Sequence, residues 1–217
     1  MSAAKLSATL AVVAAVGVAA LAGQASRAGV AGTPPAPVPK SGAAPWSAPS
    51  DPMRLARLAS LVPERAELLQ YHVHSHLDVF VNGRATSVPA GIGIDIGNPG
   101  VHRFDTPIGA AYGGISLCDR PCISPLHTHD RSGVLHTESA TPKPNRLGQL
   151  FTEWGVRLDG SCVGGCCRPG AAIAVYVDGK RYPGDPRRIG LIDGREIAIV
   201  IGSPPKQIPA GFDFSNA

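Results

Sequence analysis

Two alternating, strand-like segments that end in turn dipeptides constrain the fold of this 217-residue chain most strongly. Residues 71–81 place Tyr, Val, Ser, Leu, Val and Val at alternate positions, and Asn82-Gly83 follows directly. Residues 175–177 are followed by Asp178-Gly179 in the same way. Side chains alternate across a strand, and Asn-Gly or Asp-Gly between strands is a strong signal for a β-hairpin. The sequence therefore predicts two related hairpins, with a further buried strand in residues 196–202.

Two other segments have apolar residues at helical spacing. Residues 53–70 contain leucines with partial helical periodicity, and Pro63 is expected to break or restart this helix. Asn145 is expected to cap a second helix, which Gly155 ends. The buried face of that helix is expected to hold Leu147, Leu150, Phe151 and Trp154. The expected fold class is a mainly β (α+β) domain, an antiparallel sandwich or barrel-like sheet with one or two short helices.

The first part of the chain differs in composition from the rest. Lys5 precedes an uncharged apolar run and small residues follow it, which is typical of a secretory signal peptide in residues 1–26. An uncleaved N-terminal membrane anchor is the main alternative, and an ordinary buried helix is the third. Residues 27–53 are rich in Pro, Ala, Gly and Ser and predict a linker. We expect residues 54–217 to form one extracytoplasmic domain, either secreted or anchored to the membrane by the N-terminal segment.

The charge of the chain argues against one class of partner. The formal net charge is +4 at pH 7, and Lys5, Arg27 and Lys40 of the N-terminal part contribute to it. The small surplus that remains in the domain is not the clustered basic face that nucleic-acid-binding domains usually show. We therefore expect no nucleic-acid partner, and the sequence identifies no protein partner.

All seven histidines lie between residues 72 and 136, and three of them occupy alternate positions of the first predicted strand. These three are His72, His74 and His76. Side chains at alternate positions project from one face, which here is the face opposite the apolar positions. Histidines grouped in this way are candidate ligands for a metal ion, and the alternative is a solvated strand edge. His102 stands apart in a loop flanked by Gly and Pro, and it is left out of the predicted site.

A second group of ligand residues follows further along the chain. If residues 130–133 form a four-residue hairpin loop, His129 pairs with Val134 and His127 pairs with His136. Directly opposed residues have Cβ atoms about 4.5–5.5 Å apart, which is close enough to share one ion. The predicted ligands of this group are His127, His129, His136 and Glu138, joined by one or more of His72, His74 and His76.

Three imidazoles and a carboxylate form a ligand set that suits copper or zinc. The leading prediction is therefore an extracytoplasmic domain that binds copper or zinc. The first alternative is a metal-dependent enzyme with Glu138 or Asp130 as its acid or base. The second is a disulfide-stabilised, non-catalytic interaction module of the cell surface. Asp130 can instead serve only to begin the hairpin turn, and Glu138 can be a surface carboxylate.

Five cysteines lie in two short segments and are candidates for disulfides: Cys118, Cys122, Cys162, Cys166 and Cys167. An exported domain is expected to form disulfides, and an odd count leaves one thiol over. The pairing is left open. As an alternative, the spacing of Cys118, Cys122 and His127 resembles the copper loop of cupredoxin-like domains. The methionine that follows in the binuclear copper centre of cytochrome oxidase subunits is missing here.

Four longer segments carry a wider resemblance. They are YHVHSHLDVFVNG, VPAGIGI, CISPLHTHDRSGVLHTES and LGQLFTEWGV. Together they resemble a group of exported or membrane-anchored prokaryotic proteins that have no assigned activity. The resemblance covers residues 71–214 and implies one domain behind an N-terminal membrane segment. It implies no reaction, so the predicted metal site depends on the spacing of the histidines.

Overall fold

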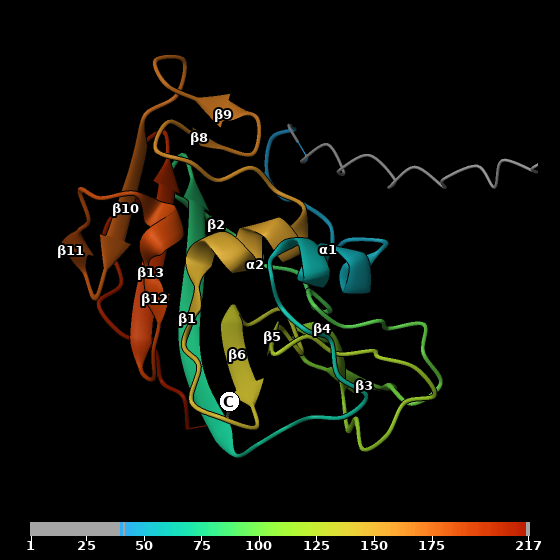
Figure 1. Ribbon diagram of the computed structural model, residues 1–217. Coiled ribbons are helices and arrows are strands. Elements are labelled where there is room, and N and C mark those ends of the chain that lie inside the picture. The colour runs from blue at the N-terminus through green and yellow to red at the C-terminus, as the bar shows by residue number, and fades with distance from the viewer. Residues whose placement is uncertain (1–39, 41, 216–217) are drawn as a thin grey trace, which may run out of the picture. The chain divides into compact units, whose positions relative to one another are not determined.

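The computed structural model of the protein describes Lys40 and residues 42–215 (Figure 1). The predicted export segment, residues 1–26, and residues 27–39 of the predicted linker lie outside this part of the chain. Within the described part, no helix combines the length and the apolar character that crossing a membrane requires.

A seven-stranded sheet in the order β11-β10-β13-β1-β6-β5, with β2 paired to β1, forms the centre of the domain. Strands β1 and β13 run parallel, and the other neighbours are antiparallel. The domain is therefore mainly β with short helices, as predicted, and this sheet does not close into a barrel. Its strands are β1 (Tyr71–Val81), β2 (Arg84–Thr86), β5 (Leu126–His127), β6 (Val134–Ser139), β10 (Ile173–Val177), β11 (Lys180–Arg181) and β13 (Arg195–Ile201).

Both predicted hairpins are confirmed. Asn82 and Gly83 have φ angles of 48° and 77°, and Asp178 and Gly179 have φ angles of 50° and 74°. Two consecutive residues at positive φ give a turn whose twist matches the flanking strands. The smaller paired elements are β3 (His102–Thr106) with β4 (Gly109–Gly113), β7 (Asn145–Arg146) with β12 (Gly190–Leu191), and β8 (Cys162–Val163) with β9 (Cys166–Cys167). A short 3-10 helix, η1 (Pro186–Arg188), precedes β12.

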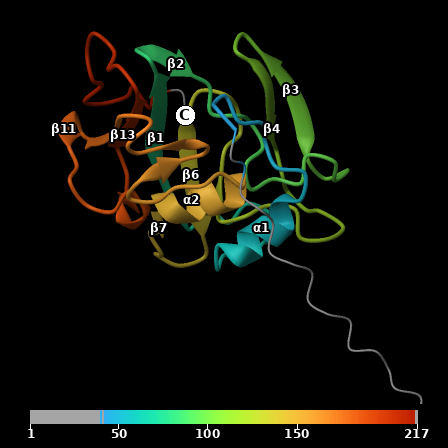
Figure 2. The same cartoon turned by 90° about the horizontal axis from the view of Figure 1, so that it is seen from above.

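Helix α2 (Leu147–Trp154) covers one face of the sheet, as Figures 1 and 2 show. Gly155, with φ 68°, ends the helix as predicted. The predicted cap is wrong by one residue, because Arg146 holds the N-cap position. Asn145 instead donates from Nδ2 to the Pro125 carbonyl and to Thr137 Oγ1, which ties the start of α2 to β6. The four apolar residues of α2 are buried in the main core as expected: Leu147, Leu150, Phe151 and Trp154.

The first helix is much shorter than predicted. Helix α1 spans Pro52–Leu58, and Ser60 adopts a φ of 60° well before Pro63 is reached. The backbone of residues 64–67 forms hydrogen bonds with the loop at 115–123. These long-range bonds replace the i to i−4 bonds that a continued helix would have made.

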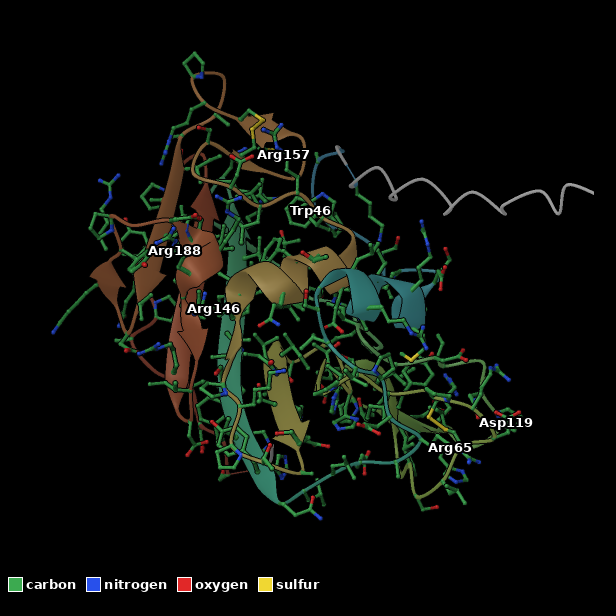
Figure 3. The ribbon with its side chains drawn as sticks, in the orientation of Figure 1. Trp46, Arg65, Asp119, Arg146, Arg157 and Arg188 are labelled. Atoms are coloured by element: carbon green, nitrogen blue, oxygen red, sulfur yellow. A yellow bond between two sulfur atoms is a disulfide. The ribbon has the colours of Figure 1, made fainter. Side chains whose placement is uncertain are left out.

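Part of the proline-rich segment predicted as a linker packs against the domain. Trp46 is buried, and its ring lies edge-on to Trp154 with the centroids 5.5 Å apart. Trp46 Nε1 donates to the Gly42 carbonyl at 2.9 Å. Figure 3 shows Trp46 beside the end of α2.

Two disulfides join neighbouring cysteines, Cys118 with Cys122 and Cys162 with Cys167, while Cys166 is a free thiol. Figure 3 shows one disulfide near Arg157 and the other near Arg65. Disulfides form in oxidising compartments, which suits an extracytoplasmic environment. Since Cys118 and Cys122 are bonded to each other, neither offers a thiolate to copper, and the cupredoxin-like alternative loses its sulfur ligands.

Candidate metal centre

Three neighbouring strands bring the predicted ligands together. The pairing of β1 with β6 sets His74 opposite His136 and His72 opposite Glu138. The pairing of β5 with β6 sets His127 opposite His136, as predicted. Adjacent strands lie about 4.7–4.9 Å apart, so side chains on the same face of β1, β6 and β5 can meet.

His129 reaches the same place from outside the sheet. The β5–β6 ladder ends at the His127–His136 pair, so the predicted pairing of His129 with Val134 is wrong. The loop between the strands is longer than expected because His129 pairs with β4 instead. Its carbonyl accepts from the Tyr112 backbone N–H at 2.9 Å, and its Nδ1 donates to the Tyr112 carbonyl.

The ligand atoms of the second predicted group converge. One such atom from each of four side chains lies within 4.8 Å of all the others: His127, His129, His136 and Glu138. His127 Nε2 lies 3.2 Å from His129 Nε2 and 3.6 Å from Glu138 Oε1, and His136 Nδ1 lies 3.6 Å from the same oxygen. Zinc–nitrogen bonds of 2.0–2.1 Å at tetrahedral angles place ligand atoms roughly 3.3 Å apart. The spacing therefore fits one ion at this point.

Hydrogen bonds decide which nitrogens of His127 and His129 face the site. Nδ1 of His127 donates to the Ser124 carbonyl at 2.8 Å, and Nδ1 of His129 donates to the Tyr112 carbonyl. A carbonyl oxygen only accepts, so both Nδ1 atoms carry a hydrogen and the Nε2 atoms are the nitrogens directed at the site. The 3.2 Å between these two Nε2 atoms is close to the spacing of two ligands of one ion. Backbone acceptors on the remote nitrogen are also the usual way in which a metal-binding imidazole is oriented.

Glu138 lies among these imidazoles and is almost completely buried. Its Oε1 also lies 3.3 Å from His72 Nε2, and its Oε2 is buried with no hydrogen-bond partner in the described part of the chain. Burial by itself raises the pKa of Glu138, but hydrogen bonds from His127 and His136 outweigh it and hold that pKa well below its ordinary value. The side chain is thus an ionised carboxylate with a free oxygen, which favours a bound cation.

Two of the imidazoles stay uncharged even at pH values well below 7. Burial lowers the pKa of His129 to about 3, and the neighbouring His127 and His136 act in the same direction. Burial lowers the pKa of His136 to about 4, against the opposing hydrogen bond with Glu138. Neutral imidazole is the form that binds metals, so both rings are ready to do so at physiological pH.

His72 and His74 form a second group with His136. The Nε2 atoms of His72 and His74 lie 2.9 Å apart, and His72 Nε2 lies 3.5 Å from His136 Nδ1. His72 is exposed and His74 is half-buried. Burial, together with the nearby His72, lowers the pKa of His74. Five of the six predicted histidines therefore belong to two groups that share His136.

The sixth predicted histidine, His76, lies in a separate group with Asp78 and Glu196. Its Nδ1 contacts Glu196 Oε2 at 2.9 Å and its Nε2 contacts the Ser132 carbonyl at 2.9 Å. Burial opposes a positive charge here, but the hydrogen bond with Glu196 raises the pKa of His76 above its ordinary value. An imidazolium that donates from both nitrogens suits these contacts. Glu196 carries no local signal as its partner, because the parallel pairing of β1 with β13 creates the contact.

Asp130 forms a turn, which is the alternative role that the sequence offered for this residue. Its Oδ1 accepts from the backbone N–H and the hydroxyl of Ser132. It also lines a pocket of about 380 Å³ whose wall includes His129, His136 and Phe212. His102, which is not part of the predicted site, is exposed on β3 and belongs to none of the three groups.

The C-terminal segment contributes to the site although its sequence gives no sign of it. Phe212 stacks on His76 with ring centroids 3.9 Å apart, and Phe214 faces His74 at 6.3 Å. Neither aromatic residue lies in a helix or strand. No periodic pattern could therefore have placed them, and only the tertiary fold brings them over the histidine face of β1.

No protein-family model, curated protein or solved structure matches the chain. The functional assignment consequently depends on the geometry of the site.

Proposed function

We propose that this protein is an extracytoplasmic metal-binding domain that holds copper or zinc at a site formed by His127, His129, His136 and Glu138. One observation carries the proposal. The Nε2 atoms of His127 and His129 face each other at 3.2 Å while both Nδ1 atoms are engaged by carbonyl oxygens. One ligand atom each of His136 and Glu138 lies within 4.8 Å of these nitrogens, so four donors converge on one point. The pKa of Glu138 is held well below its ordinary value, so the site carries a buried negative charge that a bound metal ion would balance.

The donor set supports a choice among metals. Calcium and magnesium prefer oxygen ligands, and here three of the four donors are imidazole nitrogens. Imidazole-rich sites suit copper and zinc. The disulfides support an extracytoplasmic location, and we propose that residues 1–26 direct export, as a cleaved signal peptide or as a membrane anchor.

Metal titration of the wild type and two variants tests the proposal. The metal-free chain is titrated with Zn(II) and with Cu(II) in competition with a chromophoric chelator, and bound metal is then counted by elemental analysis. The wild type should retain at least one ion per chain. The double variant His127→Ala/His136→Ala should lose the tightest ion, and His102→Ala, an exposed histidine outside the site, should load like the wild type. Equal loading of the double variant and the wild type would refute the ligand assignment.

A pocket beside the site favours a second candidate function, metal-dependent catalysis. The pocket of about 380 Å³ is lined by His129 and His136, with apolar Ile108 and Phe212 on its wall. Its volume lies in the range of small-molecule sites. In this candidate Glu138 or Asp130 supplies the acid or base. A structure of the zinc-loaded protein decides between the candidates, since catalysis requires a coordination position open to the pocket and a closed four-ligand site excludes it.

A further inference from the structure

The histidine cluster contains more donors than one ion requires. Six side chains contribute to its two overlapping groups: His72, His74, His127, His129, His136 and Glu138. A tetrahedral ion takes four donors, and the site proposed above uses four. His72 and His74 are then left over, although they point at each other from neighbouring positions on the same face of β1.

His72 and His74 have the spacing of a metal site of their own. Their Nε2 atoms lie 2.9 Å apart, and one ligand atom each from His72, His74 and His136 lies within 4.8 Å of the others. His136 Nδ1 can bind only one ion, and the group of His127 and His129 already includes His136. A second ion would therefore be bound by His72, by His74 and by a side chain that the two groups share.

Glu138 joins them. Its Oε1 lies 3.3 Å from His72 Nε2 on one side and 3.6 Å from His127 Nε2 on the other. Its Oε2 is buried and finds no hydrogen-bond donor among the described residues. A carboxylate with one oxygen between two donor groups and the other oxygen free can bridge two ions. Two-metal sites hold their ions about 3.5–4 Å apart, which is the span of such a bridge.

We infer that the metal centre is dinuclear, with a second copper or zinc ion bound by His72 and His74 and bridged to the first by Glu138. This inference rests on the proposed function, because it takes the site of His127, His129 and His136 as occupied. Two further acidic side chains stand near this position. Glu67 and Glu138 line one small pocket, and Asp193 Oδ1 accepts from the backbone N–H of His74 at 3.1 Å.

The two positions differ in their access to solvent. His127 is fully buried, whereas His72 has a side chain that is 33% exposed. The second ion therefore has room for water in its remaining coordination positions. It should bind after the first ion and be removed first by a chelator.

Metal counting and electron paramagnetic resonance of the full chain test the inference. The metal-free protein is loaded with Cu(II) alone and, separately, with Zn(II) alone, desalted and analysed for metal per chain. The wild type and the control His102→Ala should retain two ions, and His72→Ala/His74→Ala should retain one. Two Cu(II) ions about 4 Å apart interact magnetically, so the doubly loaded wild type should give a broadened spectrum with a half-field transition that isolated Cu(II) ions lack.

The outcomes separate the inference from the function on which it rests. One ion in the wild type, or two ions in His72→Ala/His74→Ala, would overturn the dinuclear centre and leave the proposed function standing. No ion in the wild type would refute the proposed function itself. If circular dichroism shows that the double variant does not fold, the wild-type signal decides, because two uncoupled spins contradict a shared carboxylate.

Discussion

Replacement of Glu138 by glutamine is the sharpest single perturbation of the proposed centre. The substitution keeps the shape of the side chain and one acceptor oxygen but removes its charge. Glu138 Oε1 lies 3.3–3.6 Å from nitrogens of His72, His127 and His136. An ion bound by any of these nitrogens would therefore lie close to the carboxylate. We expect Glu138→Gln to fold and to bind zinc much more weakly than the wild type.

The magnitude follows from the distances. At 3.6 Å, the separation of Oε1 from His127 Nε2, two unit charges interact by roughly 5 kcal/mol at an effective dielectric constant of about 20. A divalent ion would lie closer and carry two charges, while the amide oxygen and water would recover part of the loss. We therefore take about 2.7 kcal/mol, or 100-fold in the dissociation constant, as the smallest expected effect.

Competition with a chromophoric chelator at pH 7 measures this effect. Glu153→Gln is the matched control, because Glu153 is also buried but belongs to none of the candidate metal groups, and burial raises its pKa well above the ordinary value. That variant should bind zinc as the wild type does. If Glu138→Gln binds zinc with the affinity of the wild type, the carboxylate is not a ligand and the reasoning fails.

Three further predictions concern stability. Gly93 has a φ of 71°, and an added Cβ would overlap the Leu126 carbonyl, so Gly93→Ala should cost at least about 2 kcal/mol in chemical denaturation and should weaken zinc binding. Without metal, the folded state keeps His129 and His136 neutral. In the unfolded chain each of these two imidazoles takes up a proton near pH 6.5. The free energy of unfolding should therefore fall as pH drops from about 7 to 4.5, by on the order of 2 kcal/mol per ring. Trp46→Ala should cost about 3–5 kcal/mol because its ring packs on α2.

Each of these predictions has a result that would contradict it. Gly160→Ala is the control for the glycine, since nothing lies within 4 Å of an added Cβ there, and equal effects of the two substitutions would argue against the overlap at Gly93. A flat stability profile between pH 7 and 4.5 in the presence of chelator would show that the two imidazoles are not held neutral. For Trp46, a loss no larger than that of the exposed Leu117→Ala would mean that the segment before α1 does not stabilise the domain.

Local patterns predicted the parts of the fold that depend on neighbouring residues. The alternation in residues 71–81 and the Asn82-Gly83 turn predicted β1 and its hairpin, because side-chain period and turn chemistry are local properties. The opposition of His127 and His136 was also predicted, although the loop between β5 and β6 is longer than the four residues assumed. These two features place several of the candidate ligand side chains on strands, but they do not predict the contacts of His129 or of Glu138.

Features that depend on distant segments could not be predicted in this way. Residues 59–70 have helical spacing of leucines, but hydrogen bonds with the loop at 115–123 override it. The register of β1 against β6, which joins His72 to Glu138, depends on which strands become neighbours. The pairing of β1 with β13, which gives His76 its partner Glu196, is parallel and spans most of the domain.

Anomalous diffraction from a crystal of the zinc-loaded protein, recorded at the zinc absorption edge, tests the central claim most directly. The account predicts a strong peak about 2.0–2.1 Å from both His127 Nε2 and His129 Nε2, with His136 and Glu138 completing its coordination. A map without a peak between these two nitrogens, or with zinc bound only elsewhere on the chain, would contradict it.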